Sequence, residues 1–275
     1  MLRRLIPLFL ILLVLGQAVA SAATPPPKVE AEAVVLMDVG TRRLLYAVNP
    51  DAIMYPASTT KIMTALVALE KGKLDDVVTV SRRASGVEGS SLELRAGDRL
   101  TLRDLIQGMM LVSGNDAAEA VAEHIAGSVP AFVDLMNARA DKMGLTNTHF
   151  SNPHGLPDPN NHFSSARDLA IITIQALQNP EFARMVAVRE CAVPIRNRAA
   201  LQVSTTNRFL KNYPGAMGVK TGSTQAAGDC LVAAAKRGGV QLIAVLLNDD
   251  ERWDDAAHLM DYGFSVAGAA GAKGR

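Results

Sequence analysis

Aromatic residues, cysteines and an excess of one charge are all scarce in this sequence, and each scarcity excludes a class of protein. Phe, Trp and Tyr make up 4% of the 275 residues, and 28 Lys and Arg nearly balance 27 Asp and Glu. A nearly neutral chain with few aromatic side chains gives no support for nucleic-acid binding. Two cysteines, Cys191 and Cys230, are too few for a disulfide scaffold. Their apolar surroundings favour buried thiols, and whether they are bridged stays open.

The sequence also lacks the ligand spacings of a metal site. Zinc sites combine His, Cys and carboxylate ligands at short, characteristic intervals. His149 and His154 lie five residues apart across a loop that contains proline, which is a poor geometry for shared ligation. We therefore expect no metal ion.

No apolar run at the N-terminus is long enough to cross a membrane. The run from Leu5 to Leu15 has 11 residues, whereas a spanning helix needs about 20. Arg3 and Arg4 precede this run, and small residues over 18–22 fit a cleavage site. This pattern predicts a secretory signal peptide over residues 1–22. Retention of the leader as an uncleaved anchor is the alternative.

The rest of the chain divides into strands, a helical block and strands again. Residues 23–31, with three consecutive prolines, form a predicted linker, and residues 266–275 a flexible tail. The patterns predict strands at 31–40 and 42–51, and later at 216–223, 228–237 and 240–248. Between them we expect helices over about 58–70, from 101, and over 116–126, 130–143 and 166–179, with a closing helix over 253–264. Gly72 stands where a helix C-terminal glycine is favoured.

This order of elements predicts one α+β domain over residues 32–265. Strands joined by short turns pair antiparallel, and strands from the two ends of a chain can complete one sheet. We therefore expect an antiparallel five-stranded sheet flanked by helices, with the helical block as a second lobe.

Three short elements that carry chemically active side chains occur once each, in the order Ser58-Thr-Thr-Lys61, Ser113-Gly-Asn115 and Lys220-Thr-Gly222. Each element is common by itself, but the three in this order are rare. The predicted context places the first at the start of a helix, the second in a turn between helices and the third on a strand. For Ser58 the alternative is an ordinary helix N-cap.

The first element has the parts of a nucleophile and its base. Positions i and i+3 of a helix share a face, so the amine of Lys61 can lie beside the hydroxyl of Ser58. A serine hydroxyl is a poor nucleophile until a base accepts its proton. Lys61 can accept a proton only when it is neutral, and burial together with a second cation, Lys220, disfavours its charged form. We predict Ser58 as nucleophile and Lys61 as base.

The other two elements supply a side chain that can relay a proton and groups that can bind a carboxylate. Ser113 can pass the proton on to a leaving amine, and Lys220 with Thr221 offers a charge and a hydroxyl to the carboxylate. The backbone N–H groups of Ser58 and Ser223 are candidate donors to an oxyanion. The third strand, if it lies at an edge, lets the substrate align as an added strand.

Three features have a structural and a functional interpretation. Asn115 is predicted to bind substrate, which is compatible with capping the following helix. Arg252 is either a solvated surface charge or part of the site. The segment Asn152-Pro153-His154-Gly155 is predicted to build a loop rather than to take part in catalysis.

The three elements and their surroundings resemble the D-alanyl-D-alanine carboxypeptidase family, the low-molecular-mass penicillin-binding proteins. The likeness covers about residues 32–264 and includes "GSSLELRAGDRLTLRDLIQGMMLVSGNDAA", "LMNARADKMGLTNTHFSNPHGL", "SSARDLA" and "GVKTGSTQAAGDCLVAAAKR". It implies a serine β-lactamase/DD-peptidase-like fold. It also implies a peptidase that removes the terminal D-alanine from peptidoglycan pentapeptide stems through an acyl-enzyme, is trapped by penicillins and needs no cofactor.

Matched position by position, the resemblance implies a role for each site residue. Ser58 is the acylated nucleophile, Lys61 the base and Ser113 the proton relay. Lys220 and Thr221 bind the substrate carboxylate, and Arg252 falls on a family arginine that helps to hold it.

The sequence departs from many members of this family at its end. Those members continue into a β-rich domain and an amphipathic membrane anchor, whereas this chain ends just after the closing helix. The resemblance therefore implies a soluble, exported enzyme, periplasmic or extracytoplasmic, with no stable membrane anchor once the leader is cleaved.

Three alternatives to the carboxypeptidase remain. An endopeptidase that cuts peptidoglycan cross-links would carry the same elements. A class A β-lactamase would have an aspartate where this chain has Gly114, and a glutamate in a Glu-x-x-x-Asn setting before Lys220. A non-catalytic wall-binding module would not need the pair of Ser58 and Lys61.

Overall fold

The structure is a computed structural model that describes residues 25–272. The predicted signal peptide lies outside the described residues, as does the start of the predicted linker. From residue 25 to residue 31 the chain has no helix or strand, and the first strand follows directly.

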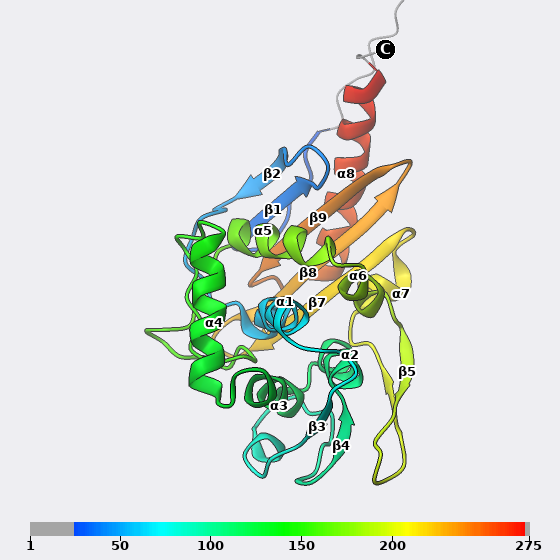
Figure 1. Cartoon of the computed structure of the whole chain (residues 1–275). Helices are drawn as coiled ribbons and strands as arrows, with labels where there is room; N and C mark the ends of the chain where they lie inside the picture. The colour runs from blue at the N-terminus through cyan, green and yellow to red at the C-terminus, as the bar shows by residue number, and fades with distance from the viewer. Residues whose placement is uncertain (1–24, 273–275) are drawn as a thin grey trace, which may run out of the picture.

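A five-stranded antiparallel sheet forms the centre of the molecule (Figure 1). Its order is β2-β1-β9-β8-β7, which confirms the predicted sheet. The first and last parts of the chain meet where β1 pairs with β9, with Val35 opposite Val245. The strand β7 stands at one edge. The bounds are β1 (Ala33–Asp38), β2 (Leu44–Val48), β7 (Ala216–Thr224), β8 (Gly228–Arg237) and β9 (Val240–Leu247).

Both faces of this sheet are buried, which explains why its inner strands are almost continuously apolar. Side chains alternate between the faces of a strand. In β8, Val232 packs into the core on the side of the helical block, and Leu231 packs against α8 (Arg252–Ala272). A strand covered on one side only would alternate apolar and polar residues.

The helical block follows the predicted order (Figure 1). The predicted caps are confirmed at two helices: Thr101 accepts from the backbone N–H of Asp104, and Ser165 from that of Asp168. The bounds are η1 (Ala57–Thr60), α1 (Lys61–Lys71), α2 (Leu102–Val112), α3 (Asn115–Ala126), α4 (Val129–Lys142) and α5 (Ala166–Leu177). In Figure 1, α5 crosses one face of the sheet, and α8 lies on the other.

Sequence analysis did not predict several short helices and strands. They contain three to seven residues each, too few for a periodic pattern to emerge. They are β3 (Val77–Thr79), η2 (Ala84–Gly86), β4 (Arg99–Thr101), α6 (Pro180–Val186), β5 (Glu190–Val193), β6 (Leu201–Ser204) and α7 (Arg208–Asn212).

The structure confirms the predicted position of Gly72 at the end of α1 but extends the closing helix beyond its predicted end. Gly72 ends α1 with extended backbone, and a Cβ there would lie 2.4 Å from Leu102, so close packing requires this glycine. The helix α8 was expected to end near Phe264, but its backbone stays helical to Ala272. Alanine is the strongest helix former, and no proline interrupts the alanine-rich segment that we had assigned to a flexible tail.

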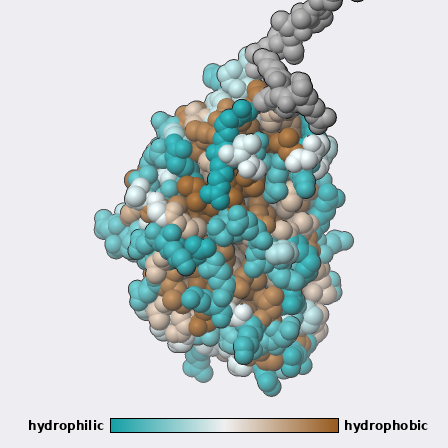
Figure 2. All heavy atoms as spheres, turned by 45° about the horizontal axis from the view of Figure 1, so that its top comes forward, coloured by the Kyte–Doolittle hydropathy of each residue, from teal (hydrophilic) through white to brown (hydrophobic). Residues whose placement is uncertain are grey.

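Polar side chains cover most of the face drawn in Figure 2, with smaller apolar patches between them. No helix within residues 25–272 combines the length and apolar character needed to span a membrane. Both cysteines are free: Cys230 is buried as expected, whereas Cys191 is only partly buried on β5.

Candidate active site

Ser58 lies in the short helix η1, directly before α1. The N-cap of α1 is Thr60 and that of η1 is Pro56, and neither helix start has a side-chain capping bond. The N-cap explanation of Ser58 is therefore wrong. The preceding residue, Ala57, has a φ of 45°. This conformation is costly for a residue with a side chain and is often found at functional sites.

Lys61 is fully buried, and its Nζ contacts three oxygen atoms. These are Ser58 Oγ at 3.0 Å, Asn115 Oδ1 at 2.7 Å and the backbone oxygen of His154 at 2.7 Å. The oxygens of Asn115 and His154 can only accept hydrogen bonds. A neutral amine has two N–H donors and one lone pair. Once its donors are given to these two oxygens, the lone pair is directed at the Ser58 hydroxyl.

The surroundings of Lys61 favour its neutral form. Burial lowers the pKa of Lys61 well below its ordinary value, the charge of Lys220 lowers it further, and Asp116 opposes them. Lys220 is also buried, and burial together with the charge of Arg252 lowers the pKa of Lys220 to about 7. The charge of Lys220 thus adds to burial in disfavouring the charged form of Lys61.

The second element is a tight turn between α2 and α3. Ser113 adopts a left-handed conformation with a φ of 65°. Its Oγ is buried and makes no hydrogen bond within the described part of the chain. Asn115 begins α3 without capping it: its Oδ1 accepts from Lys61, and its Nδ2 donates to the backbone oxygen of Glu88 at 2.6 Å.

The third element lies on the edge strand β7, directly beside η1. A Cβ at Gly222 would lie 3.0 Å from the backbone nitrogen of Ser58, so a glycine allows this close approach. Lys220 Nζ donates to the backbone oxygen of Thr221 at 2.8 Å. Ser223, one residue beyond Gly222, is exposed.

Arg252 is not a solvated surface charge. It lies at the start of α8, and its Nη1 donates to the backbone oxygens of Gly222 at 2.8 Å and Cys230 at 3.3 Å. The same atom lies 3.1 Å from a carboxylate oxygen of Asp229. Arg252 therefore links β7 to β8 through these hydrogen bonds, and it adds positive charge near Lys220.

Sequence analysis missed two parts of the site. The segment from Asn152 to Gly155 is a loop, as expected, but the loop also supplies the carbonyl oxygen of His154 to Lys61. No side-chain pattern could have predicted this contact, because a backbone carbonyl can belong to any residue. The second is Thr206, whose Oγ1 lies 2.9 Å from Thr221 Oγ1. Its neighbourhood in the sequence carries no distinctive pattern.

A buried hydrogen bond between a neutral histidine and a glutamate supports the loop that holds Lys61, because burial lowers the pKa of His154. His154 Nε2 lies 3.3 Å from Glu119 Oε1 on α3, and both side chains are buried. The backbone N–H of Leu156 donates to His154 Nδ1 at 3.2 Å, so Nε2 carries the proton that faces Glu119. The pair fixes the position of the residue whose carbonyl oxygen binds Lys61.

We expect Gly155→Ala to destabilise the protein strongly. Gly155 has a φ of 94°, and a Cβ there would lie 1.8 Å from the backbone oxygen of Ala57. The backbone around Ser58 would have to move. Gly144→Ala is the matched control, because Gly144 has a φ of 72° with nothing within 4 Å. The control isolates the conformational cost, about 1–2 kcal/mol. Thermal unfolding should show a clearly larger loss for Gly155→Ala, and equal losses would contradict this account.

No cluster of three or more His, Cys, Asp or Glu side chains within residues 25–272 is arranged to hold a metal ion.

Comparison with known proteins agrees with this geometry. A family model described as D-alanyl-D-alanine carboxypeptidase matches residues 19–251. The carboxypeptidase DacF of Bacillus subtilis is 38% identical over 86% of this chain, and DacB2 of Mycobacterium tuberculosis is 35% identical over 90%. The crystal structure of the Streptomyces K15 DD-transpeptidase superposes with a TM-score of 0.83 at 35% identity, covering 88% of this chain and all of that one.

The relatives differ in how much of their length this chain spans. It covers 62% of DacF and 63% of DacA from Haemophilus influenzae, but 86% of DacB2. The family match nevertheless takes in η1, the turn between α2 and α3, and β7, which are the three segments that carry the three sequence elements. With both the sequence and the fold in agreement over most of its length, this chain belongs to the D-alanyl-D-alanine carboxypeptidase family.

Proposed function

We propose that this protein is a serine-type carboxypeptidase that removes the terminal D-alanine from peptidoglycan pentapeptide stems. The observation that carries the proposal is the environment of Lys61. The neutral amine of Lys61 donates its two hydrogens to Asn115 Oδ1 and to the backbone oxygen of His154, which can only accept. Its lone pair is therefore available to Ser58. A binding module would not need a buried amine against a hydroxyl.

The reaction begins when Lys61 Nζ accepts the proton of the Ser58 hydroxyl. Ser58 Oγ attacks the carbonyl carbon of the penultimate D-alanine, and the N–H groups of Ser58 and Ser223 stabilise the oxyanion. The proton then passes from Lys61 through Ser113 Oγ, which makes no hydrogen bond within residues 25–272, to the amine of the leaving D-alanine. Water hydrolyses the acyl-enzyme by the reverse sequence of proton transfers.

The third element binds the substrate. We propose that Lys220 and Thr221 bind the terminal carboxylate, and that Arg252 supports them through its charge and its contact with Gly222. The stem peptide aligns along the edge strand β7 as an added strand. Asn115 positions Lys61, and the second Nδ2 hydrogen of Asn115 is left for a substrate carbonyl.

The structure favours a peptidase over a class A β-lactamase. A Cβ at Gly114 would lie 2.7 Å from Asp116 Oδ1 and 2.9 Å from the backbone nitrogen of Leu92. The aspartate of those β-lactamases therefore has no space here without movement of the loop. We expect penicillins to acylate Ser58 and to be released slowly.

Defined peptidoglycan fragments test the proposed activity. The protein is incubated with pentapeptide monomers and, separately, with cross-linked dimers, and free D-alanine is quantified. We expect stoichiometric D-alanine from the monomers in the wild type and none with Ser58→Ala. Cleavage of dimers without release of D-alanine would instead show an endopeptidase, and rapid turnover of penicillin without any peptide cleavage a β-lactamase.

We further propose that the protein acts outside the cytoplasm. The leader over residues 1–22 supports export, and peptidoglycan, the proposed substrate, is extracytoplasmic. N-terminal sequencing of the protein recovered from the cell envelope should begin within a few residues of Ala23. An intact N-terminus on cytoplasmic protein would contradict export.

The pair of Glu119 and His154 is expected to position Lys61. Glu119→Ala removes the acceptor of His154 Nε2, so the carbonyl oxygen that binds Lys61 loses its support. We expect acylation by a fluorescent penicillin to slow about tenfold, as for loss of one buried charged hydrogen bond. Glu119→Gln keeps an acceptor oxygen and should restore most of the rate. A rate that is unchanged in Glu119→Ala, or equally low in both variants, would exclude this role.

A further inference from the structure

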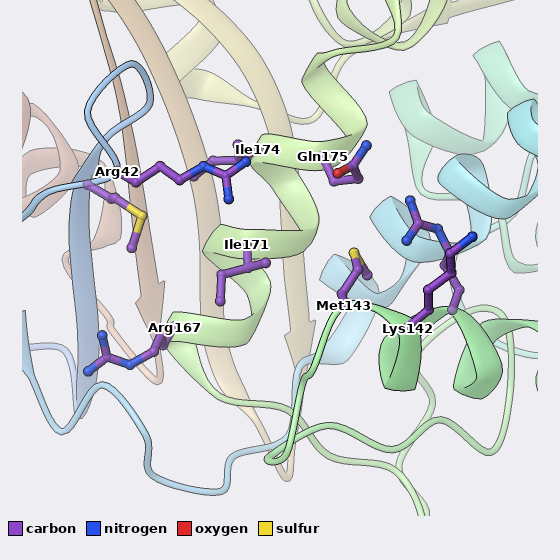
Figure 3. A pocket seen from close by; sticks show the side chains of 9 residues that line it. Arg42, Lys142, Met143, Arg167, Ile171, Ile174 and Gln175 are labelled. Atoms are coloured by element: carbon purple, nitrogen blue, oxygen red, sulfur yellow. The ribbon is translucent and has the colours of Figure 1, made fainter.

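One cavity lies apart from the candidate active site. It has a volume of about 440 Å³ and is bounded by α5, the end of α4 and the β1–β2 turn (Figure 3). None of its lining residues belongs to the site around Lys61. Its volume falls in the range of ligand pockets, about 300–1,000 Å³. Four apolar side chains line it: Met37, Met143, Ile171 and Ile174.

The remaining lining is almost entirely basic. It consists of one glutamine and four cations, with no Asp or Glu: Gln175, Arg42, Arg139, Lys142 and Arg167. Two of the cations are ion-paired to acids outside the cavity, Arg139 to Glu70 and Arg167 to Asp51. The other two, Arg42 and Lys142, are exposed and form no ion pair within residues 25–272. The cavity therefore keeps positive charge beside an apolar surface.

The conformation of the β1–β2 turn does not favour an arginine at position 42. Arg42 has a φ of 57°, in the left-handed region. Glycine or asparagine adopts this conformation at lower cost. Figure 3 shows the Arg42 side chain extending from the turn toward Ile174 on α5, while Lys142 and Met143 lie on the other side of Ile171. An arginine in this strained position places its guanidinium over the apolar surface of α5.

We propose that this cavity binds an anionic amphiphile, a molecule that carries a phosphate or carboxylate on an apolar chain. The chain packs on Ile171, Ile174 and Met143, and the anion binds at one side of the cavity, to Arg42 or to Lys142, which lie on opposite sides of Ile171. A free inorganic anion would leave the apolar surface uncovered, and an uncharged amphiphile would leave both cations without a partner. This inference rests on different residues from the proposed function and does not depend on it.

Calorimetric titration of the full protein with dodecyl phosphate, below its micelle concentration, tests the proposal. Inorganic phosphate and dodecyl maltoside serve as the anion alone and the chain alone. We expect dodecyl phosphate to bind at least tenfold more tightly than either. In the double variant Arg42→Ser, Lys142→Ser its affinity should fall about tenfold or more, because the charge-assisted contact is lost at both sides of the cavity. Ile171→Asn should weaken binding independently of charge.

Two controls show whether dodecyl phosphate binds at this cavity rather than to surface charge in general, and whether the cavity variants leave the active site intact. Lys73→Ser and Lys211→Ser remove exposed lysines that do not line this cavity and should bind dodecyl phosphate as the wild type does. The double variant should still be acylated by penicillin at the wild-type rate. Equal affinity for dodecyl phosphate in the wild type and the double variant would overturn the proposal, as would equal binding of inorganic phosphate or dodecyl maltoside.

Discussion

Replacing Lys61 by methionine is expected to slow acylation of Ser58 by penicillin about 10³-fold, within the range of general base catalysis. Methionine has a similar length and fills the same buried space, but it has no lone pair of sufficient basicity. The Ser58 hydroxyl then keeps its proton. The effect should fall on the rate of acylation rather than on prior binding of the inhibitor, because the lost interaction forms in the transition state.

The control for this variant is Lys71→Met, at the other end of the same helix, where the side chain is exposed. It should acylate at the wild-type rate. Thermal unfolding of Lys61→Met monitors folding, since Asn115 Oδ1 and the oxygen of His154 lose their donor in this variant. A folded Lys61→Met protein that keeps more than a tenth of the wild-type rate would show that another group is the base.

Lys220 is expected to set the alkaline limit of activity on peptides. Its pKa is lowered to about 7, chiefly by burial and then by the charge of Arg252. The ammonium form therefore predominates below this pH and is lost as the pH rises through it. Because kcat/KM reports the free enzyme, kcat/KM for a peptide with a free carboxylate should decline above about pH 7. On the acid side, protonation of Lys61 should lower kcat/KM in turn.

Lys220→Met should remove this alkaline decline and reduce kcat/KM at pH 6. One charged hydrogen bond is worth about 1.5–3 kcal/mol, so a reduction of about 10- to 100-fold is expected. Lys236→Met, on the neighbouring strand and exposed, is the matched control. A substrate whose terminal carboxylate is amidated should show no alkaline decline even in the wild type. The same decline in Lys220→Met as in the wild type would assign it to another group.

Long, strongly patterned elements could be predicted from the sequence. The strands β8 and β9 contain long apolar runs and are separated by two glycines. Thr101 and Ser165 are N-cap residues, and they mark the starts of two helices in the sequence. The antiparallel sheet follows from short connections, and joining of the two chain ends through β1 and β9 follows from the need to bury both faces. The two-stranded sheets β3–β4 and β5–β6 could not be predicted, because strands of three or four residues form no distinct pattern.

The site was predictable as far as it consists of side chains in a known order. Ser58, Lys61 and Asn115 lie within hydrogen-bonding distance, and Gly222 brings the strand of Lys220 against Ser58. The contact between the carbonyl oxygen of His154 and Lys61 was not predictable, because every residue type has the same backbone carbonyl. Nor was the pair of Glu119 and His154, because residues 35 positions apart in the chain meet only through the tertiary fold.

The most direct test of the central claim is to locate the covalent adduct that penicillin forms with this protein. The protein is incubated with a penicillin near neutral pH, digested, and its peptides are analysed by mass spectrometry. We predict a single adduct on Ser58, absent from Ser58→Ala and formed about 10³-fold more slowly in Lys61→Met. An adduct on Ser113 or another residue, or one on Ser58 that forms equally fast without Lys61, would contradict activation of Ser58 by the buried amine.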